Sequence, residues 1–378
     1  MQGLQNGNER GLSDVFAENR KISLRQLQVL LLLDSFGTAV LFLPAELAQI
    51  NGKACWMAAL IGGGVFVLLS LFLATLGEKL PSGTVVEWCR NVFGYGPGTV
   101  VLTGLLAKIF LDGLLELRIF SEIICRAMLP NTPVWVISLV LLLVAGTLAL
   151  QGPECRGRGG EVLFFVTFLP LIPVLLAVAV SAEYGRTMPM PMPSFGSTVG
   201  SILPISIVFQ GLTFLYFVFP CLQKREKAAA AVSISSLLST GILTVVVFLC
   251  LAVYGAEVLS EKLLPALQMM ERISFTKVFL TRQDLLLFWF WMASVCIFLS
   301  GALLYGSFLA RKLFRQKAEK QKKWQLGWLL LLFGAALLPE NLAAAYRLRL
   351  MVSPWLNLLY LLVLPVLLLI LAKRRGWE

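Results

Sequence analysis

The chain alternates long apolar runs with short polar segments, and ten of the runs have the length of a membrane-spanning helix. Such a helix needs about 20 mainly apolar residues, because the hydrocarbon core of a bilayer is about 30 Å thick. The runs lie at 24–47, 55–76, 100–127, 134–150, 161–181, 197–221, 232–254, 285–310, 324–340 and 354–372. The pattern therefore predicts an all-α, polytopic membrane protein with ten transmembrane helices.

The first and the sixth runs contain the same kind of interruption. The residues that mark it are Asp34, Gly37, Thr38 and Ala39 in the first run and Gln210, Gly211 and Thr213 in the sixth. Glycine and hydrogen-bonding side chains at mid-depth favour local unwinding. A membrane tolerates unwound backbone only where protein or a water-filled cavity satisfies it. We expect both helices to be broken and to present a ligand with the residues Gly37, Thr38, Ala39, Gln210, Gly211 and Thr213, with a kink or a close helix contact as the alternative.

The two breaks divide the chain into halves of five runs each. Broken helices at corresponding places are typical of transporter folds built from inverted repeats, whose solute site lies near the middle of the bilayer. The organisation predicted is a cytoplasmic tail 1–23, a first repeat 24–181, a second repeat 197–372 and a cytoplasmic tail 373–378.

Composition and charge agree with a membrane protein. The chain is 58% hydrophobic and 14% charged, whereas soluble domains average about 25% charged. Most of the 32 Lys and Arg residues fall on one side when the N-terminus is placed in the cytoplasm, with Arg156 counted inside and Arg349 outside. This bias follows the positive-inside rule and predicts that both termini are cytoplasmic. The basic segment 311–323 suits anionic membrane lipid, and its one aromatic residue, Phe314, does not make the series of stacking aromatics that nucleic-acid binding requires.

The sequence offers no metal centre, cofactor site or enzyme active site. Histidine is absent, which removes the commonest metal ligand. The seven cysteines are scattered without a CxxC pair and suit small apolar packing positions. No nucleophile–base set or phosphate-binding loop is present, which argues against an enzyme.

The third and eighth runs carry further polar and aromatic candidates. Lys108, Asp112 and Glu116 recur every four residues and share one helix face. We expect Lys108 and Asp112 to join Asp34 in a polar, coupling lining, with internally neutralised packing pairs as the alternative. The side chains expected to shape the pocket for the ligand's tail are Phe110, Ser300 and Tyr305.

Several stretches, in order along the chain, resemble one family. They are Ile22 to Gln26 with Leu41 to Pro44, Leu117 to Ile123 with Leu129 to Pro133, Gly152 to Glu161, Phe209 to Pro220 with Lys224 and Lys227, and Pro265 to Arg272 with Arg282 to Asp284 and Trp291. Together they resemble the endospore germination permease family, the B subunits of GerA-type nutrient receptors, over nearly all of the apolar region.

The resemblance implies a five-plus-five inverted fold similar to amino acid–polyamine–cation transporters of the LeuT-like type. It also implies a nutrient sensor in the inner membrane of the dormant spore, assembled with an A subunit and a lipoprotein C subunit. Amino acids or similar small nutrients are the implied ligands. Many relatives place an acidic residue where this chain has Thr213, so that acid's role does not carry over. A secondary amino-acid or cation transporter and a structural scaffold are the alternatives.

Overall fold

Helices account for nearly all of the chain in a computed structural model that describes residues 21–80, 83–271 and 283–374. Every predicted apolar run coincides with helical structure. Most of the predicted N-terminal tail and the end of the C-terminal tail lie outside the described residues. Helical structure satisfies the backbone within each segment, which is what an apolar environment demands.

The first half of the chain contains one broken helix and five continuous ones. The elements are α2 (Leu24–Ser35) and α3 (Ala39–Asn51), then α4 (Cys55–Lys79), α5 (Val85–Phe93), α6 (Tyr95–Ala127), α7 (Val134–Leu150) and α8 (Pro153–Ser181). Short helix α5 follows Thr84, whose amide donates to Glu87 Oε2 at 2.9 Å, and is followed by Gly94, whose φ of 85° suits glycine.

The second half begins with the other broken helix. Its elements are α9 (Phe195–Val208), a 3₁₀ turn (Gln210–Phe214), α10 (Leu215–Val218) and a second 3₁₀ turn (Phe219–Cys221). There follow α11 (Ala228–Tyr254), α12 (Ala256–Glu261), α13 (Pro265–Glu271), α14 (Gln283–Leu313), α15 (Gln321–Ala336), α16 (Leu342–Leu358), a π-helical turn (Leu359–Val363) and α17 (Leu364–Arg374).

The number of helices that meet the length and apolarity of a membrane span is smaller than the number of apolar runs in the sequence. Among the described residues, five helical segments are long and apolar enough to cross a membrane, and the bent pair Phe195–Val208 and Gln210–Cys221 makes a sixth. Long apolar helices of this kind fit an integral, polytopic membrane protein. Ten crossings and an inverted repeat stay predictions.

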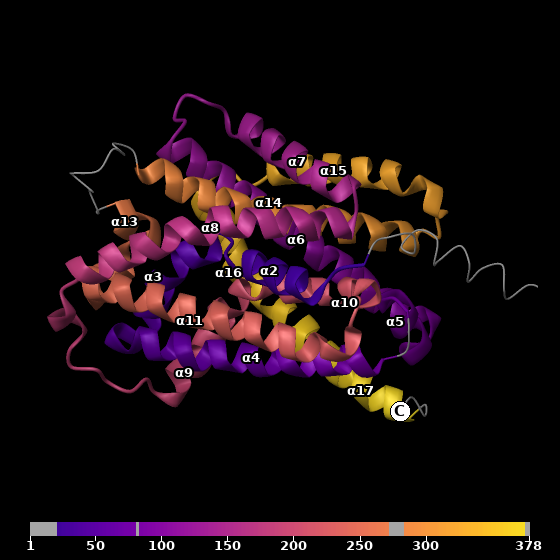
Figure 1. Ribbon diagram of the computed structural model, residues 1–378, viewed down its shortest axis with the longest axis horizontal. Coiled ribbons are helices and arrows are strands. Elements are labelled where there is room, and N and C mark those ends of the chain that lie inside the picture. Colours follow the sequence, from indigo (N-terminus) through magenta and orange to yellow (C-terminus); the bar gives the residue numbers. More distant parts are fainter. Residues whose placement is uncertain (1–20, 81–82, 272–282, 375–378) are drawn as a thin grey trace, which may run out of the picture.

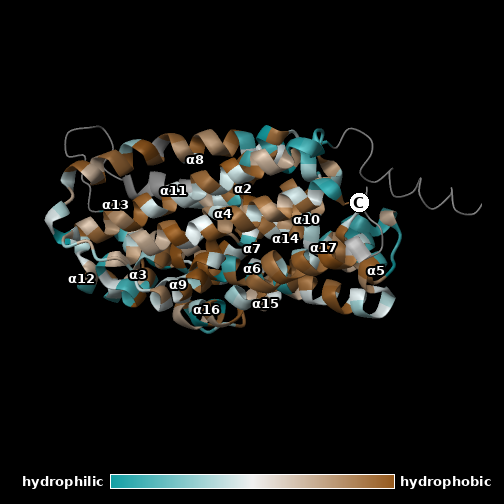
Figure 2. Cartoon of the chain, turned by 90° about the horizontal axis from the view of Figure 1, so that it is seen from below, coloured by the Kyte–Doolittle hydropathy of each residue, from teal (hydrophilic) through white to brown (hydrophobic). Residues whose placement is uncertain are grey.

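Helices α2 and α10, which belong to the two broken helices, lie near the middle of the bundle (Figure 1). In this view α7, α15, α14, α6 and α8 lie on one side of them, and α11, α4 and α9, the first part of the second broken helix, lie on the other. All described residues of the turn Gln210–Phe214 and of α10 are buried. Apolar colouring covers long stretches of the outer helices, and hydrophilic residues gather toward the two ends of the bundle (Figure 2).

A short backbone contact joins the two broken elements at one end. Ile22, just before α2, forms a parallel β-bridge with Leu222, just after the turn Phe219–Cys221. The Ile22 amide donates to the Cys221 carbonyl at 2.8 Å, and the Gln223 amide donates to the Ile22 carbonyl at 3.1 Å. The bridge holds the start of one broken helix beside the end of the other.

Candidate functional site

The first break presents a backbone amide to a buried carboxylate. Helix α2 ends at Ser35 and α3 begins at Ala39, so residues 36–38 lie outside regular helix. The Thr38 amide donates to Glu116 Oε1 at 2.6 Å. A Cβ on Gly37 would lie 2.6 Å from the same oxygen, so glycine allows this approach. Because helix N-termini carry partial positive charge, the start of α3 suits an anion.

The second break reaches the same carboxylate from the other half of the chain. Helix α9 ends at Val208, and the segment that follows it is bent by 58°. The Gln210 side chain donates from Nε2 to Glu116 Oε2 at 3.3 Å. Gly211 contacts Asp34 so closely that a Cβ there would overlap the Asp34 side chain. Both helices are therefore interrupted where the glycines predict, and the two breaks lie against each other.

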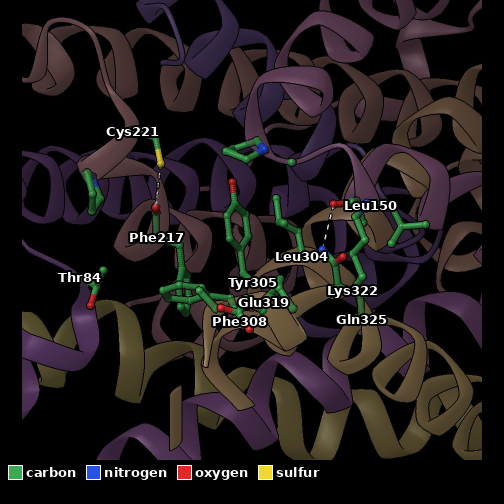
Figure 3. Close-up of a pocket in the computed structure, with 16 residues that line it drawn as sticks. Thr84, Leu150, Phe217, Cys221, Leu304, Tyr305, Phe308, Glu319, Lys322 and Gln325 are labelled. Atoms are coloured by element: carbon green, nitrogen blue, oxygen red, sulfur yellow. Dashed lines mark hydrogen bonds between the residues drawn. The ribbon is translucent and has the colours of Figure 1, made fainter. Parts of the chain in front are cut away.

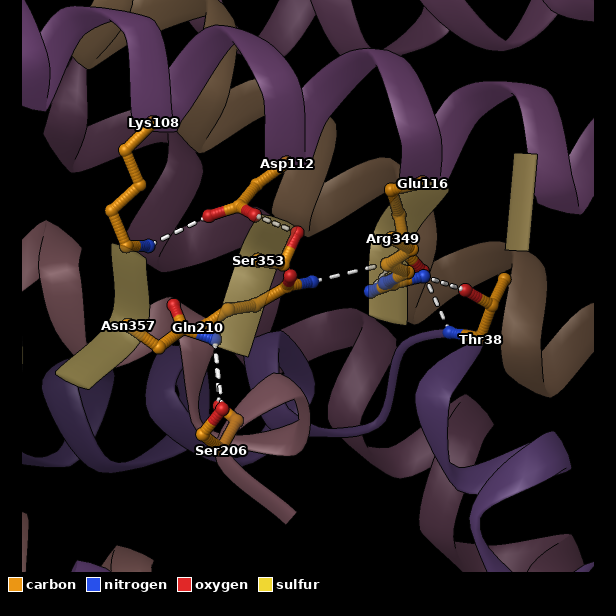
Figure 4. Close-up of polar contacts among 9 residues, drawn as sticks. All are labelled: Thr38, Lys108, Asp112, Glu116, Ser206, Gln210, Arg349, Ser353 and Asn357. Carbon is orange, nitrogen blue, oxygen red and sulfur yellow. Dashed lines mark hydrogen bonds and ion pairs between the residues drawn. The ribbon is translucent and has the colours of Figure 1, made fainter. Parts of the chain in front are cut away.

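Helices α6 and α16 run antiparallel beside the breaks and pair their polar side chains turn by turn (Figure 4). Glu116 Oε2 lies 2.5 Å from Arg349 Nη2. One turn along, Asp112 accepts from Ser353 Oγ at 2.9 Å and lies 2.6 Å from Lys108 Nζ. We name the set Thr38, Lys108, Asp112, Glu116, Gln210, Arg349 and Ser353 the central polar cluster.

Arg349 is the site residue that the sequence pattern misplaces. The apolar run begins at 354, which leaves Arg349 outside the membrane, but Asn341 caps α16 and the helix begins at Leu342. Two turns into this helix, Arg349 is 1% exposed and also donates to the Thr38 hydroxyl. The sequence does contain a signal for this buried polar face of α16, because its polar residues recur every four positions, as those of α6 do. The residues are Arg349, Ser353 and Asn357 in α16 and Lys108, Asp112 and Glu116 in α6.

Asp34 belongs to a second charged pair, with Arg156 of α8. Arg156 Nη2 lies 2.6 Å and 2.7 Å from the two Asp34 oxygens. The positive-inside count treats Arg156 as a cytoplasmic cation, whereas the structure buries it to 1% exposure. The reason is that α8 begins at Pro153, earlier than its apolar run, and turns Arg156 inward. We name this contact the Asp34–Arg156 pair.

Ser300 and Tyr305, both predicted from the eighth run, lie against the Asp34–Arg156 pair. The Ser300 hydroxyl accepts from Arg156 Nε at 3.2 Å. The Arg156 guanidinium lies 5.6 Å from the centre of the Tyr305 ring and 5.4 Å from that of Phe214, within the range of cation–π attraction. Tyr305 also lines a cavity of about 370 Å³ beside Phe217 and Leu304 (Figure 3).

Three predicted residues have other surroundings. Phe110 is half-buried against Trp328 of α15, with ring centres 5.4 Å apart, on a different face of α6 from Lys108 and Asp112. Ala39 is the buried first residue of α3. The Thr213 hydroxyl is buried and has no hydrogen-bond partner among the described residues.

The central polar cluster is balanced in charge but incompletely hydrogen-bonded. Two cations, Lys108 and Arg349, face two carboxylates, Asp112 and Glu116. Within the described part of the chain, Gln210 Oε1 and Arg349 Nε are buried without a partner. Buried polar atoms are costly unless paired, and these two place an acceptor and a donor at the junction of the two broken helices.

The fold and this site define an integral membrane protein in which two interrupted helices meet at a buried, charged centre. The profile of the family described as spore germination protein, the spore permeases, matches residues 21–344. The chain therefore belongs to the spore germination permease family.

Three proteins of Bacillus subtilis (strain 168) are similar over most of their length. Spore germination protein YndE is 21% identical over 364 residues, which cover 96% of this chain and 99% of YndE. Spore germination protein KB is 22% identical over 376 residues, 95% of this chain and 97% of KB. Spore germination protein B2 is 22% identical over 315 residues, 82% of this chain and 83% of B2.

Proposed function

We propose that this chain is the nutrient-sensing membrane subunit of a spore germinant receptor. It binds a small nutrient, an amino acid in the first instance, between its two broken helices and signals to partner A and C subunits. The observation that carries the proposal is that both breaks, 172 residues apart at Thr38 and Gln210, donate hydrogen bonds to one carboxylate, Glu116. A ligand at this point touches both halves of the chain at once.

The position of the ligand between the two broken helices explains how its binding produces a signal. A ligand shifts a conformational equilibrium only by its difference in affinity for the two states. A solute held by the Thr38 amide and by Gln210 binds best when the halves are arranged to bring both groups to it. The family membership and the names of the relatives support a role in spore germination. We place the receptor in the inner spore membrane, with both termini cytoplasmic.

The experiment is nutrient-triggered germination of spores that lack the gene for this chain, tested with amino acids, sugars and nucleosides. Loss of the response to one subset supports the proposal and names the ligand class. Complementation with Gly37→Leu, which fills the space that Glu116 now occupies, is expected to leave that response absent with the protein present in the membrane. A full response in the Gly37→Leu strain rules out the break as the site.

A secondary amino-acid or cation transporter is the second candidate, because broken helices around a polar centre are what such transporters use. Proteoliposomes that contain only this chain distinguish the two. Uptake of a labelled amino acid driven by an ion gradient favours the transporter, and binding without uptake favours the receptor subunit.

A further inference from the structure

We propose that the Glu116–Arg349 ion pair is a zwitterion selector: the nutrient enters by separating the two side chains, placing its carboxylate on Arg349 and the Thr38 amide and its ammonium group on Glu116. The inference rests on the proposed function and deepens it, because it names the ligand class and the two residues that select it.

The geometry supplies a complete carboxylate site that the chain's own carboxylate fills. Glu116 accepts from the Thr38 amide at 2.6 Å, from Gln210 at 3.3 Å and from Arg349 at 2.5 Å. A backbone amide at a helix start and a guanidinium are the groups that proteins use to bind carboxylates. The three donors come from the first break, the second break and α16, which are the elements that a ligand must bring together.

Charge balance explains why both charges of the ligand are needed. Glu116 is 0% and Arg349 1% exposed, so neither can be left alone. Opening a buried ion pair is strongly unfavourable unless each partner regains an opposite charge. A simple carboxylate would free Glu116 unpaired, and a simple amine would free Arg349 unpaired. A zwitterion compensates both, and the neighbouring Lys108–Asp112 contact is unchanged.

The space at Gly37 limits where the ligand lies. A Cβ added to Gly37 would lie 2.6 Å from Glu116 Oε1, so the carboxylate lies directly against the backbone of the break. The unpartnered Arg349 Nε and Gln210 Oε1 are further polar atoms available at the same point, a donor and an acceptor. They match the carboxylate and the ammonium group of an α-amino acid.

The test compares three series of probes on spores that carry the full receptor: neutral L-amino acids, the matching L-amino-acid amides, and the matching deaminated carboxylic acids. We expect germination with at least one amino acid, and half-maximal concentrations about a hundredfold or more higher for its amide and its deaminated acid. An amide or a deaminated acid that acts as well as the amino acid overturns the selector and leaves the receptor role standing. A wild-type strain that responds to none of the amino acids, sugars or nucleosides overturns both.

A double variant that removes both charges of the Glu116–Arg349 pair distinguishes a role in ligand selection from a purely structural role. Glu116→Gln alone leaves Arg349 buried without its partner and can prevent folding, so the informative variant is Glu116→Gln with Arg349→Gln. We expect this double variant to reach the membrane in normal amount and to lose the amino-acid response. The matched control, Arg118→Gln with Glu122→Gln, removes another buried ion pair of α6, whose atoms lie 2.7 Å apart, and should keep the preference for amino acids. A normal amino-acid response in the first double variant overturns the proposal.

Discussion

The Asp34 carboxylate receives both of its described hydrogen bonds from a single nitrogen, Arg156 Nη2, at 2.6 Å and 2.7 Å. Asp34 lies in the last turn of α2 before the first break, and Arg156 lies near the start of α8. The contact therefore fixes the first break against the bundle. Arg156 Nε also donates to the Ile297 carbonyl at 3.3 Å and to the Ser300 hydroxyl at 3.2 Å, both in α14, which extends the connection to the second half of the chain.

Neutralising Arg156 is expected to destabilise the protein strongly. Arg156→Gln leaves Asp34 buried at 2% exposure without a cation, and breaking a buried pair from one side costs about 3–5 kcal/mol. Thermal unfolding of the purified full chain in detergent measures the effect.

The matched control for Arg156→Gln is Arg158→Gln in the same helix. Arg158 pairs with Glu154 at the same 2.6 Å distance, but its side chain is 73% exposed. Exposed pairs contribute only about 0–1 kcal/mol. Equal unfolding temperatures for the two variants would contradict the importance given to the buried pair.

Gly211→Ala is expected to disturb the meeting point of the two breaks. The added methyl group overlaps the Asp34 side chain, and overpacking of this kind costs about 1–3 kcal/mol. We expect a lower unfolding temperature and a reduced nutrient response at normal protein level.

Gly327→Ala provides the comparison for Gly211→Ala. Gly327 lies inside α15 with nothing within 4 Å of its Cβ position, and glycine in a helix costs about 0.5–1 kcal/mol relative to alanine. This variant should be as stable as the parent chain or more so. A Gly211→Ala protein as stable as Gly327→Ala would show that the breaks are not in tight contact.

Two threonines, one in each break, are expected to respond oppositely to valine. Thr38→Val removes the oxygen that accepts from Arg349 and leaves that buried donor unpaired, which costs about 1–3 kcal/mol. The Thr213 hydroxyl has no partner among the described residues, so Thr213→Val should leave unfolding unchanged or raise its temperature. A marked destabilisation by Thr213→Val would show that its hydroxyl has a structural bond.

The cysteines offer a test of orientation. Of the seven, Cys155 is half-buried and the other six are buried. Burial raises the pKa of the Cys89 thiol, in α5, to about 12. Because the thiolate is the reactive form, Cys89 should resist a membrane-impermeant maleimide at pH 7 to 9, while Cys155 is accessible at the start of α8.

The expected result is labelling of Cys155 in inside-out vesicles and none in intact cells, with Cys155→Ser as the control that abolishes it. Labelling of intact cells at Cys155 would contradict cytoplasmic termini.

The apolar runs and the two breaks could be predicted from sequence because their causes are local. Run length follows from bilayer thickness. Breaks follow from glycine and polar side chains at mid-helix, and Gly37, Gln210 and Gly211 lie where those rules place them. Whether all ten runs cross the membrane depends on how the helices surround one another, which no single run encodes.

The charged partners could not be predicted from composition. Arg156 and Arg349 flank apolar runs, and the positive-inside rule counts such residues as cytoplasmic or outer charges. Both are buried because α8 and α16 begin before their runs do, at Pro153 and Leu342. Pairing of Glu116 with Arg349 joins residues 233 apart, and only the spacing of four residues in each helix indicated that two polar faces were available.

The bridge between Ile22 and Leu222 limits how the two broken helices can move. Backbone groups make its hydrogen bonds, so side-chain substitutions other than proline keep the donors and acceptors. If the two elements separate while the bridge holds, the residues beside the bridge move least. The far ends of α3 and α9 are then free to move most.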